Sequence, residues 1–305
     1  MATKTSLLGL TKPAYTEAAD IAVLNTNFDL IDKAVGQGAR VWNLLDNSYF
    51  PSAYVINQRG ATSYSGSWAR CIDRWICVTR GDAKFWSNPT NIGVPAGGRI
   101  VQCLNVKAAD VVGKTYTLAF ANTTGTVYVG SGTVKAPTDT TLYHIAQDNN
   151  GVIVWLYSVA TDGYLYAVLY NNSSYTVPLV WAALYEGAYT ADTLPAYVYK
   201  GYAAELLECQ RYYIKIATQP VSGWCYNWGR VTVFVPLPVT MRVASPTVSV
   251  TSASRNFYIG STAYAAEPTG STAVSNGISV YFSHSHTGNG QCIMPEFSAE
   301  VSADF

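Results

Sequence analysis

The chain has 305 residues, enough for two domains of ordinary size, and its 19 basic and 19 acidic side chains give a formal net charge of zero. A neutral chain without a basic cluster lacks the positive surface that nucleic-acid-binding proteins use, so we expect no nucleic-acid partner. Charged residues make up only 12% of the sequence, whereas tyrosine occurs 23 times and tryptophan 8 times, a composition that suits β-strands with faces buried between strands or subunits.

The sequence predicts a protein that folds in a cytoplasm and does not insert into a membrane. No segment approaches the run of about 18 apolar residues that a membrane span needs, and residues 1–13 lack the apolar core of a signal peptide. No CxxC pair or zinc-ligand spacing occurs, so we expect no cofactor. We expect the cysteines to be reduced and packed as small apolar side chains, with a Cys71–Cys77 disulfide as the alternative.

The first predicted element is a helix over residues 16–35. Its large apolar side chains are spaced three, four, three and four residues apart, which gives the a/d pattern of a coiled coil. These residues are Ile21, Leu24, Phe28, Ile31 and Val35. Gly36 and Gly38 are expected to end the helix. Two heptads are also compatible with an amphipathic helix that packs on its own domain, so the pattern alone leaves self-association open.

Residues 40–203 are predicted to form an antiparallel sandwich or jelly roll. Runs rich in β-branched and aromatic residues alternate with turn-forming segments, and no helical period lies between them. The runs are residues 100–106, 115–122, 126–134, 152–160, 164–171 and 177–187.

A second, smaller β-sandwich is predicted for residues 204–305. Residues 202–216 have one turn of helix-like sequence before a strand, which marks a junction. Beyond it, Pro236, Pro238 and Pro246 interrupt alternating apolar runs, so these positions are expected at strand ends or edges. The predicted fold is all-β, divided into residues 1–39, 40–203 and 204–305.

Several motifs resemble those of phage and prophage tail-fibre proteins. Residues 12–35, KPAYTEAADIAVLNTNFDLIDKAV, resemble the N-terminal attachment segment of such fibres. Residues 43–78 resemble the start of their jelly-roll module, which is similar to carbohydrate-binding modules, with NQRG at 57–60 and DRW at 73–75 as direct matches. The motifs ELLECQRYY, FVPLPVTMRVASPTV and FSAEVSADF resemble the C-terminal β domain of these proteins.

The resemblance implies a homotrimeric component of the virion tail that adheres to a bacterial cell-surface glycan. Its N-terminal segment would attach it to other tail or baseplate proteins, and residues 16–35 would form a trimeric bundle. None of the motifs is a catalytic signature, so we expect a receptor-binding protein without enzymatic activity.

The segment 223–229, GWCYNWG, is the most site-like stretch. In an extended strand its alternating aromatic residues point to one side, where flat rings suit the apolar face of a sugar and nearby polar groups bind hydroxyls. The proposed residues are Trp224, Tyr226, Asn227, Trp228 and Arg230. The alternative is that these rings fill a core or a subunit interface.

A second candidate for sugar binding is the segment 85–91, with Phe85, Trp86, Asn88 and Asn91. Three other tryptophans lie within predicted strands and are expected in the core, namely Trp75, Trp155 and Trp181.

His284 and His286 would face the same way in an extended segment, and three copies around an axis would offer six nitrogen ligands for a metal. That arrangement resembles the His-x-His iron sites of some long fibre tips. The following residues, TGNG at 287–290, predict an ordinary hairpin turn, and a solvated loop is the preferred interpretation. His144 lies in a strand run and is expected to be structural.

Two other functions remain open at this stage. A structural spacer or collar without its own ligand would bury its aromatic residues. A depolymerase would need two facing carboxylates, for which Asp162 with Glu186 or Asp192 is the available pair, although no catalytic motif accompanies them.

Overall fold

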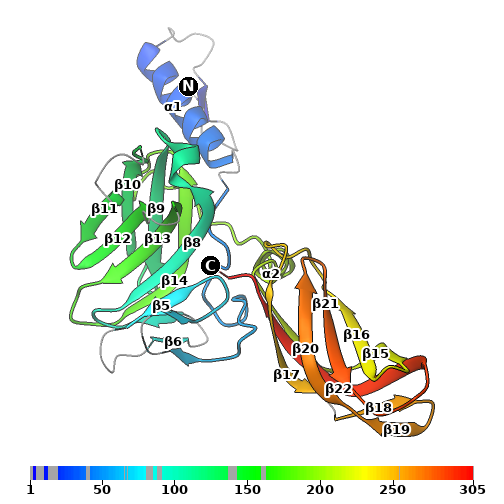
Figure 1. Ribbon diagram of the computed structural model, residues 1–305. Coiled ribbons are helices and arrows are strands. Elements are labelled where there is room, and N and C mark those ends of the chain that lie inside the picture. Colours follow the sequence, from blue (N-terminus) through cyan, green and yellow to red (C-terminus); the bar gives the residue numbers. More distant parts are fainter. Residues whose placement is uncertain are drawn as a thin grey trace.

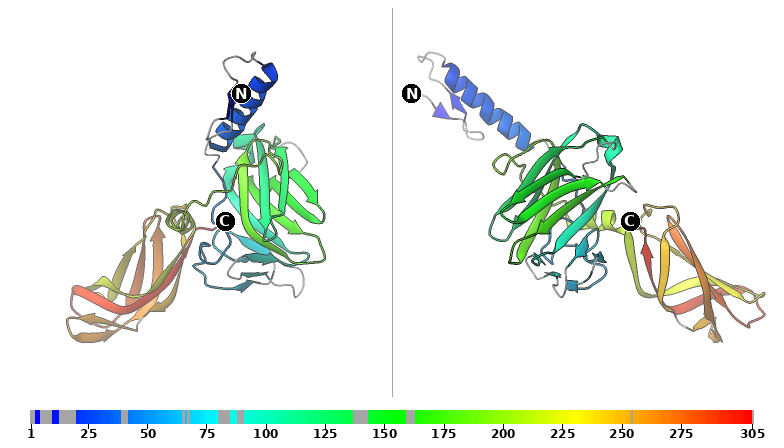
Figure 2. Two further views of the ribbon diagram at one scale, coloured as in Figure 1. Left: turned by 180° about the vertical axis from the view of Figure 1, so that it is seen from behind. Right: turned by 60° about the vertical axis from the view of Figure 1, so that its left-hand side comes forward.

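The computed structural model confirms the all-β class, with 52% of the residues in strands and 9% in helices (Figure 1). It describes residues 3–4, 10–12, 20–38, 42–64, 66, 68–79, 85–87, 91–136, 143–158, 163–253 and 255–304. Figure 2 shows helix α1, a sandwich and a C-terminal sheet following one another along the molecule. None of the helices in these residues is long and apolar enough to cross a membrane.

Two antiparallel six-stranded sheets form the sandwich. The first has the order β10 (Val127–Thr133), β9 (Thr115–Asn122), β14 (Val177–Glu186), β7 (Ile92–Val94), β6 (Phe85–Ser87) and β3 (Ser63–Tyr64). The second has the order β11 (Tyr143–Asn149), β12 (Val152–Ser158), β13 (Tyr164–Asn171), β8 (Arg99–Lys107), β5 (Ile76–Val78) and β4 (Ala69–Arg70). A short 3-10 helix, η1 (Ala108–Val111), follows β8. The arrangement is compatible with the predicted jelly roll.

The core of the sandwich consists of the inward residues of both sheets, because side chains alternate between the two faces of a strand. Trp75, which is 1% exposed, lies at its centre with edge-to-face contacts to Phe50 and Phe120. The prediction that Trp75 is a core residue is confirmed. Trp155 and Trp181 are only half-buried and lie outside this core, so the expectation that they are core residues was wrong for Trp181. Trp155 instead packs against a smaller buried cluster on the outer face of the second sheet.

Helix α1 (Ile21–Gly38) begins later than the sequence pattern predicts. Asp20 caps it, since its carboxylate accepts a hydrogen bond of 2.8 Å from the Ala22 N–H. Residues 16–19 lie outside the described residues, and Gly36 does not end the helix, which continues to Gly38. The Asn27 side chain donates to and accepts from the backbone of Thr11 in β2 (Thr11–Lys12), which pairs with β1 (Thr3–Lys4).

The apolar seam of α1 is uncovered. Ile21 is 72% exposed and Phe28 is 62% exposed, and Leu24 and Ile31 are exposed as well. Val35 lies in α1, but its side chain is outside the described part of the chain. The alternative that this seam packs on its own domain is therefore wrong for the four side chains that are described.

Beyond α2 (Tyr202–Gln210), the remaining strands form one continuous sheet and not two separate sheets. The strand order is β19 (Thr262–Ala265), β18 (Asn256–Ile259), β22 (Gly290–Ser302), β15 (Tyr213–Tyr226), β16 (Arg230–Pro236), β21 (Gly277–Ser283) and β20 (Glu267–Val274), and β17 (Thr247–Ala253) also pairs with β22. The sheet closes around its own apolar core, in which Phe257, Phe282 and Phe297 are fully buried. Prolines 236 and 246 lie at strand boundaries, as predicted.

The motifs at 57–60 and 73–75 lie where the sandwich meets the C-terminal sheet. The Gln58 amide donates hydrogen bonds of 2.6 Å to Asp73 and 2.8 Å to the Tyr213 carbonyl. Arg59 forms ion pairs with Asp73 (3.2 Å) and Asp304 (2.6 Å), and its guanidinium carbon lies 3.7 Å from the centroid of the Tyr213 ring. These residues therefore connect the two β units.

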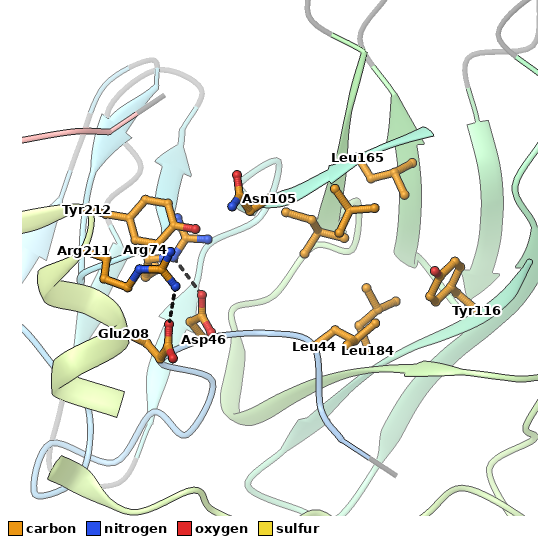
Figure 3. A pocket seen from close by; sticks show the side chains of 12 residues that line it. Leu44, Asp46, Arg74, Asn105, Tyr116, Leu165, Leu184, Glu208, Arg211 and Tyr212 are labelled. Atoms are coloured by element: carbon orange, nitrogen blue, oxygen red, sulfur yellow. Dashed lines mark hydrogen bonds and ion pairs between the residues drawn. The ribbon is translucent and has the colours of Figure 1, made fainter. Parts of the chain in front are cut away.

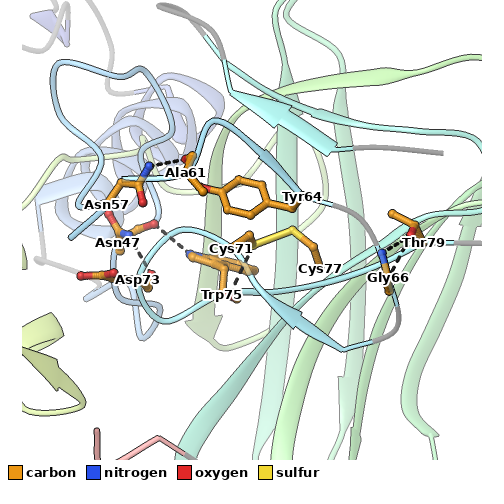
Figure 4. The surroundings of a disulfide bond; sticks show 10 residues. All are labelled: Asn47, Asn57, Ala61, Tyr64, Gly66, Cys71, Asp73, Trp75, Cys77 and Thr79. Atoms are coloured by element: carbon orange, nitrogen blue, oxygen red, sulfur yellow. Dashed lines mark hydrogen bonds between the residues drawn. A yellow bond between two sulfur atoms is a disulfide. The ribbon is translucent and has the colours of Figure 1, made fainter. Parts of the chain in front are cut away.

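A disulfide joins Cys71 to Cys77 beneath this contact, so the expectation that all six cysteines are reduced was wrong (Figure 4). Asn47 connects several segments of the same region. Its side-chain amide donates to the backbone carbonyls of Ile56 and Asp73, and its backbone carbonyl accepts a hydrogen bond from the Trp75 indole N–H. The other four cysteines, Cys103, Cys209, Cys225 and Cys292, are buried and form no disulfide.

Candidate functional site

The predicted segment 223–229 forms the end of β15 and the turn into β16. Along β15, Cys225 points into the core and is fully buried, so Trp224 and Tyr226 point outward on the other face. Gly229, with φ of 94°, supplies the left-handed conformation that this turn requires. Trp224 is 48% exposed and Trp228 is 63% exposed, which is unusual for such large apolar side chains.

Arg230 lies among these rings. It faces Tyr226 across the hairpin, and its guanidinium carbon lies 3.6 Å from the Tyr281 ring centroid and 5.7 Å from that of Trp228. The rings of Tyr226 and Trp228 are 5.2 Å apart. We call Trp224, Tyr226, Trp228, Arg230 and Tyr281 the C-terminal aromatic platform. It combines flat apolar rings with a cation that has no ion-pair partner among the described residues.

The histidine loop lies against this turn and does not form a local hairpin. Strands β21 and β22 are separated in the sheet by β16 and β15, so residues 284–289 cross the end of the sheet. The His284 N–H donates to the Gly229 carbonyl, and the Asn227 N–H donates to the Asn289 side chain. The structure thus brings the two predicted sites together, and Asn227 itself is exposed at their border.

Both ring nitrogens of His284 have partners within the chain. Nδ1 accepts the N–H of His286 at 3.0 Å, so neutral His284 has its proton on Nε2, which lies 3.3 Å from the Cys225 sulfur. The ring of His286 lies 4.1 Å from that of Tyr264. Burial raises the pKa of the Cys225 thiol. In the described part of the chain, no group of three or more His, Cys, Asp or Glu side chains could hold a metal ion.

The segment 85–91 is only partly described. Trp86 lies in β6, opposite Ser63 of β3, but its side chain is outside the described part of the structure, as is Asn88. Asn91 is buried. The described backbone places β6 in the first sandwich sheet, whereas the C-terminal aromatic platform lies on the C-terminal sheet. His144 is buried, accepts from the Lys135 N–H and lies 3.1 Å from Ser158, as suits a structural residue.

Sequence reasoning missed an aromatic cleft on the outer face of the second sandwich sheet. The cleft has a volume of about 120 Å³ and is lined by Trp68, Val78, Arg99, Val101, Tyr143, Trp155, Tyr157 and Val168. The alternation in residues 152–158, VIVWLYS, is the signal that places Trp155 and Tyr157 on one face. The alternation does not indicate which of the two faces of β12 is covered by the first sandwich sheet.

A cavity of about 200 Å³ lies between the sandwich and α2 (Figure 3). Its polar end has two ion pairs, Arg74–Asp46 at 3.0 Å and Arg211–Glu208 at 3.4 Å. The Arg74 guanidinium also lies 3.4 Å from the centroid of the Tyr212 ring. Its charges are already paired with one another, so the cavity belongs to the connection between the two β units.

The candidate carboxylates for glycoside hydrolysis are only partly described, because both proposed pairs include Asp162. Glu186 forms an ion pair with Lys114 at 3.1 Å on the surface, Asp192 is exposed, and Asp162 lies outside the described residues. Inverting and retaining enzymes alike need two carboxylates that face each other across the substrate.

Comparison with known proteins gives no relative. No family model, curated protein or solved structure matches this chain.

Proposed function

We propose that the protein is a tail-fibre-type receptor-binding protein that adheres to a bacterial cell-surface glycan without cleaving it. The observation that carries this proposal is the exposure of Trp224 and of Trp228, whose ring centroid lies 5.7 Å from the Arg230 guanidinium carbon. A pyranose ring can stack its C–H face on such indoles, while its hydroxyls accept hydrogen bonds from the guanidinium.

The position of the platform supports this function. Strand β15 starts at Tyr213 beside α2 and ends at Tyr226, so the platform lies at the end of the C-terminal sheet that is remote from the sandwich. Helix α1 extends from the sandwich on its other side (Figure 2). Attachment through the N-terminus would leave the platform free to meet a cell surface.

The uncovered seam of α1 supports a homotrimer as the working assembly. Exposed Ile, Leu and Phe side chains in an a/d pattern are stabilised when identical helices bury them against one another. Three platforms on one trimer would raise the avidity for a repetitive polysaccharide without any new contact.

Adhesion is tested by labelling a panel of bacterial strains with the fluorescent full-length protein, before and after periodate oxidation of surface sugars. The proposal predicts that some strains are labelled, that oxidation abolishes the labelling, and that Trp224→Ala with Trp228→Ala does the same while the native mass is unchanged. Labelling that survives oxidation would assign a non-glycan receptor. An intact protein that labels no strain would favour a structural spacer.

A further inference from the structure

The outer face of the second sandwich sheet has a row of aromatic side chains that the C-terminal aromatic platform does not include. Along β12, the inward residues belong to the core, so Trp155 and Tyr157 point outward. The rings of Tyr170, Trp155, Tyr143, Tyr157 and Tyr166 follow one another with centroid separations of 5.4, 5.3, 6.1 and 5.4 Å. Strands β11, β12 and β13 thus carry a continuous row of rings on this surface, in which Tyr143 is exposed and Tyr166 is buried.

The cleft of about 120 Å³ lies within this surface. Its floor is apolar, because Val101 and Val168 are each 1% exposed. Trp68 and Tyr143 line it and are exposed, and Trp68 has a φ of 59°, a conformation that a bulky side chain rarely adopts. The cleft is smaller than pockets that enclose a whole ligand, so it suits one unit of a longer chain lying on the surface.

Among the described residues, Arg99 is the one cation that lines the cleft. Its guanidinium carbon lies 5.1 Å from the Trp155 ring centroid and 4.7 Å from that of Tyr170. No carboxylate or other hydrogen-bond acceptor pairs with it among the described residues. Asp148 is on the same face but three strands away in the register, roughly 14 Å at ordinary strand spacing, and accepts a hydrogen bond from Gly151.

We infer that this cleft, defined as the Arg99 cleft, binds a carboxylate-bearing sugar, either a hexuronic acid or a sialic acid unit of an acidic polysaccharide. The half-buried guanidinium has N–H donors arranged to bind both oxygens of a carboxylate, and the neighbouring rings restrict its orientation. The same rings provide a flat apolar surface for the pyranose. The site is in a different β unit from the platform and has its own ligand chemistry, so it stands or falls independently of the proposed function.

The test titrates the full-length protein with oligogalacturonate and with a sialyl-oligosaccharide, each beside its carboxyl-reduced counterpart. One acidic probe is expected to bind at least tenfold more tightly than its reduced form, and its identity distinguishes the two sources. Arg99→Gln should weaken this binding at least tenfold. Arg99→Lys should retain only part of the affinity, because lysine keeps the positive charge but cannot bind both carboxylate oxygens in the same way.

Matched variants separate this site from the platform and from misfolding. Trp68→Ala and Tyr143→Ala change exposed side chains and should each weaken the binding several-fold, even if Arg99→Gln failed to fold. Trp228→Ala should leave it unchanged. The inference is overturned if neither acidic probe binds, if the reduced probe binds equally well, or if the Arg99 cleft variants bind normally. The inference is also overturned if the Arg99 cleft variants change the native mass and leave probe binding unaltered. That result would assign this face to contact between copies of the chain.

Discussion

Asp73 is the buried carboxylate at the contact between the sandwich and the C-terminal sheet. Gln58 and Arg59 both donate to it, yet burial is the larger effect and raises the pKa of Asp73 to about 6. The folded protein therefore holds this proton more tightly than the unfolded chain, whose carboxyl has the ordinary value of 3.8. Asp73 thus contributes stability at acidic pH that is lost as the pH rises through about 6.

Replacing Asp73 by Asn should remove this pH dependence. A difference of roughly two pKa units corresponds to about 3 kcal/mol, so the wild type should lose up to that amount of stability relative to Asp73→Asn between pH 4 and pH 7. Thermal midpoints of both proteins across this range measure it, with Asp110→Asn, at an exposed carboxylate, as the control. The same wild-type-to-variant difference at every pH would contradict the account of Asp73.

The Cys71–Cys77 disulfide predicts a definite count of reactive thiols. After unfolding without reductant, four thiols should react with a maleimide reagent, and six should react after reduction. In the folded protein the four cysteines outside the disulfide are buried and should react slowly. Mass spectrometry of the labelled chain gives the count directly. Six labels without reductant would show that Cys71 and Cys77 are thiols.

Helix α1 is the element from which assembly can be tested separately from binding. A charge at Phe28 would place a carboxylate in the apolar seam of the proposed bundle, whereas Asn25 is exposed on the solvated face. Phe28→Asp should therefore convert the proposed trimer to a monomer in light scattering, and Asn25→Asp should not. Neither substitution touches the core of the sandwich, so the melting of that part should change little. A Phe28→Asp protein with the native mass of the wild type would exclude the seam as the contact.

The strands could be predicted where the alternation of residues and the turn residues alone determine the strand bounds. The alternation and turn residues between 99 and 187 place β8, β9, β10, β12, β13 and β14 within a few residues of their observed bounds. The same alternation cannot say which strand face is covered, and for this reason Trp155 and Trp181 were assigned to the core. Trp181 instead stacks 5.1 Å from Tyr197, in the connection to α2.

Features that depend on distant pairing could not be derived from the sequence. The histidine loop meets Asn227 only because β15 and β16 lie between β21 and β22, an order that no local pattern specifies. Arg99 reaches Trp155 and Tyr170 through the pairing of β8, β13 and β12. The aromatic segment at 223–229 was predictable as a candidate, because its alternating rings point to one side of an extended strand. The same pattern also fits a core or a subunit interface, so it could not show that Trp224 and Trp228 are exposed.

The whole molecule has its proposed assembly element and its proposed binding surface at opposite ends. Helix α1 is on one side of the sandwich and the C-terminal sheet is on the other (Figure 1). Gln58, Arg59 and Arg74 fix the C-terminal sheet to the sandwich through hydrogen bonds, ion pairs and stacking. In this arrangement, a particle held at the N-terminus of the protein would be connected through the sandwich to the surface that the C-terminal aromatic platform contacts.

The affinity of the full-length protein for surface polysaccharide extracted from a labelled strain tests the proposed adhesion at the C-terminal aromatic platform most directly. Trp228→Ala removes a side chain that is 63% exposed, and Trp42→Ala removes one that is 64% exposed but remote from the platform. We predict that Trp228→Ala weakens binding about tenfold, or ~1.4 kcal/mol, while Trp42→Ala binds as the wild type does. Equal affinities for all three proteins would contradict adhesion through the C-terminal aromatic platform.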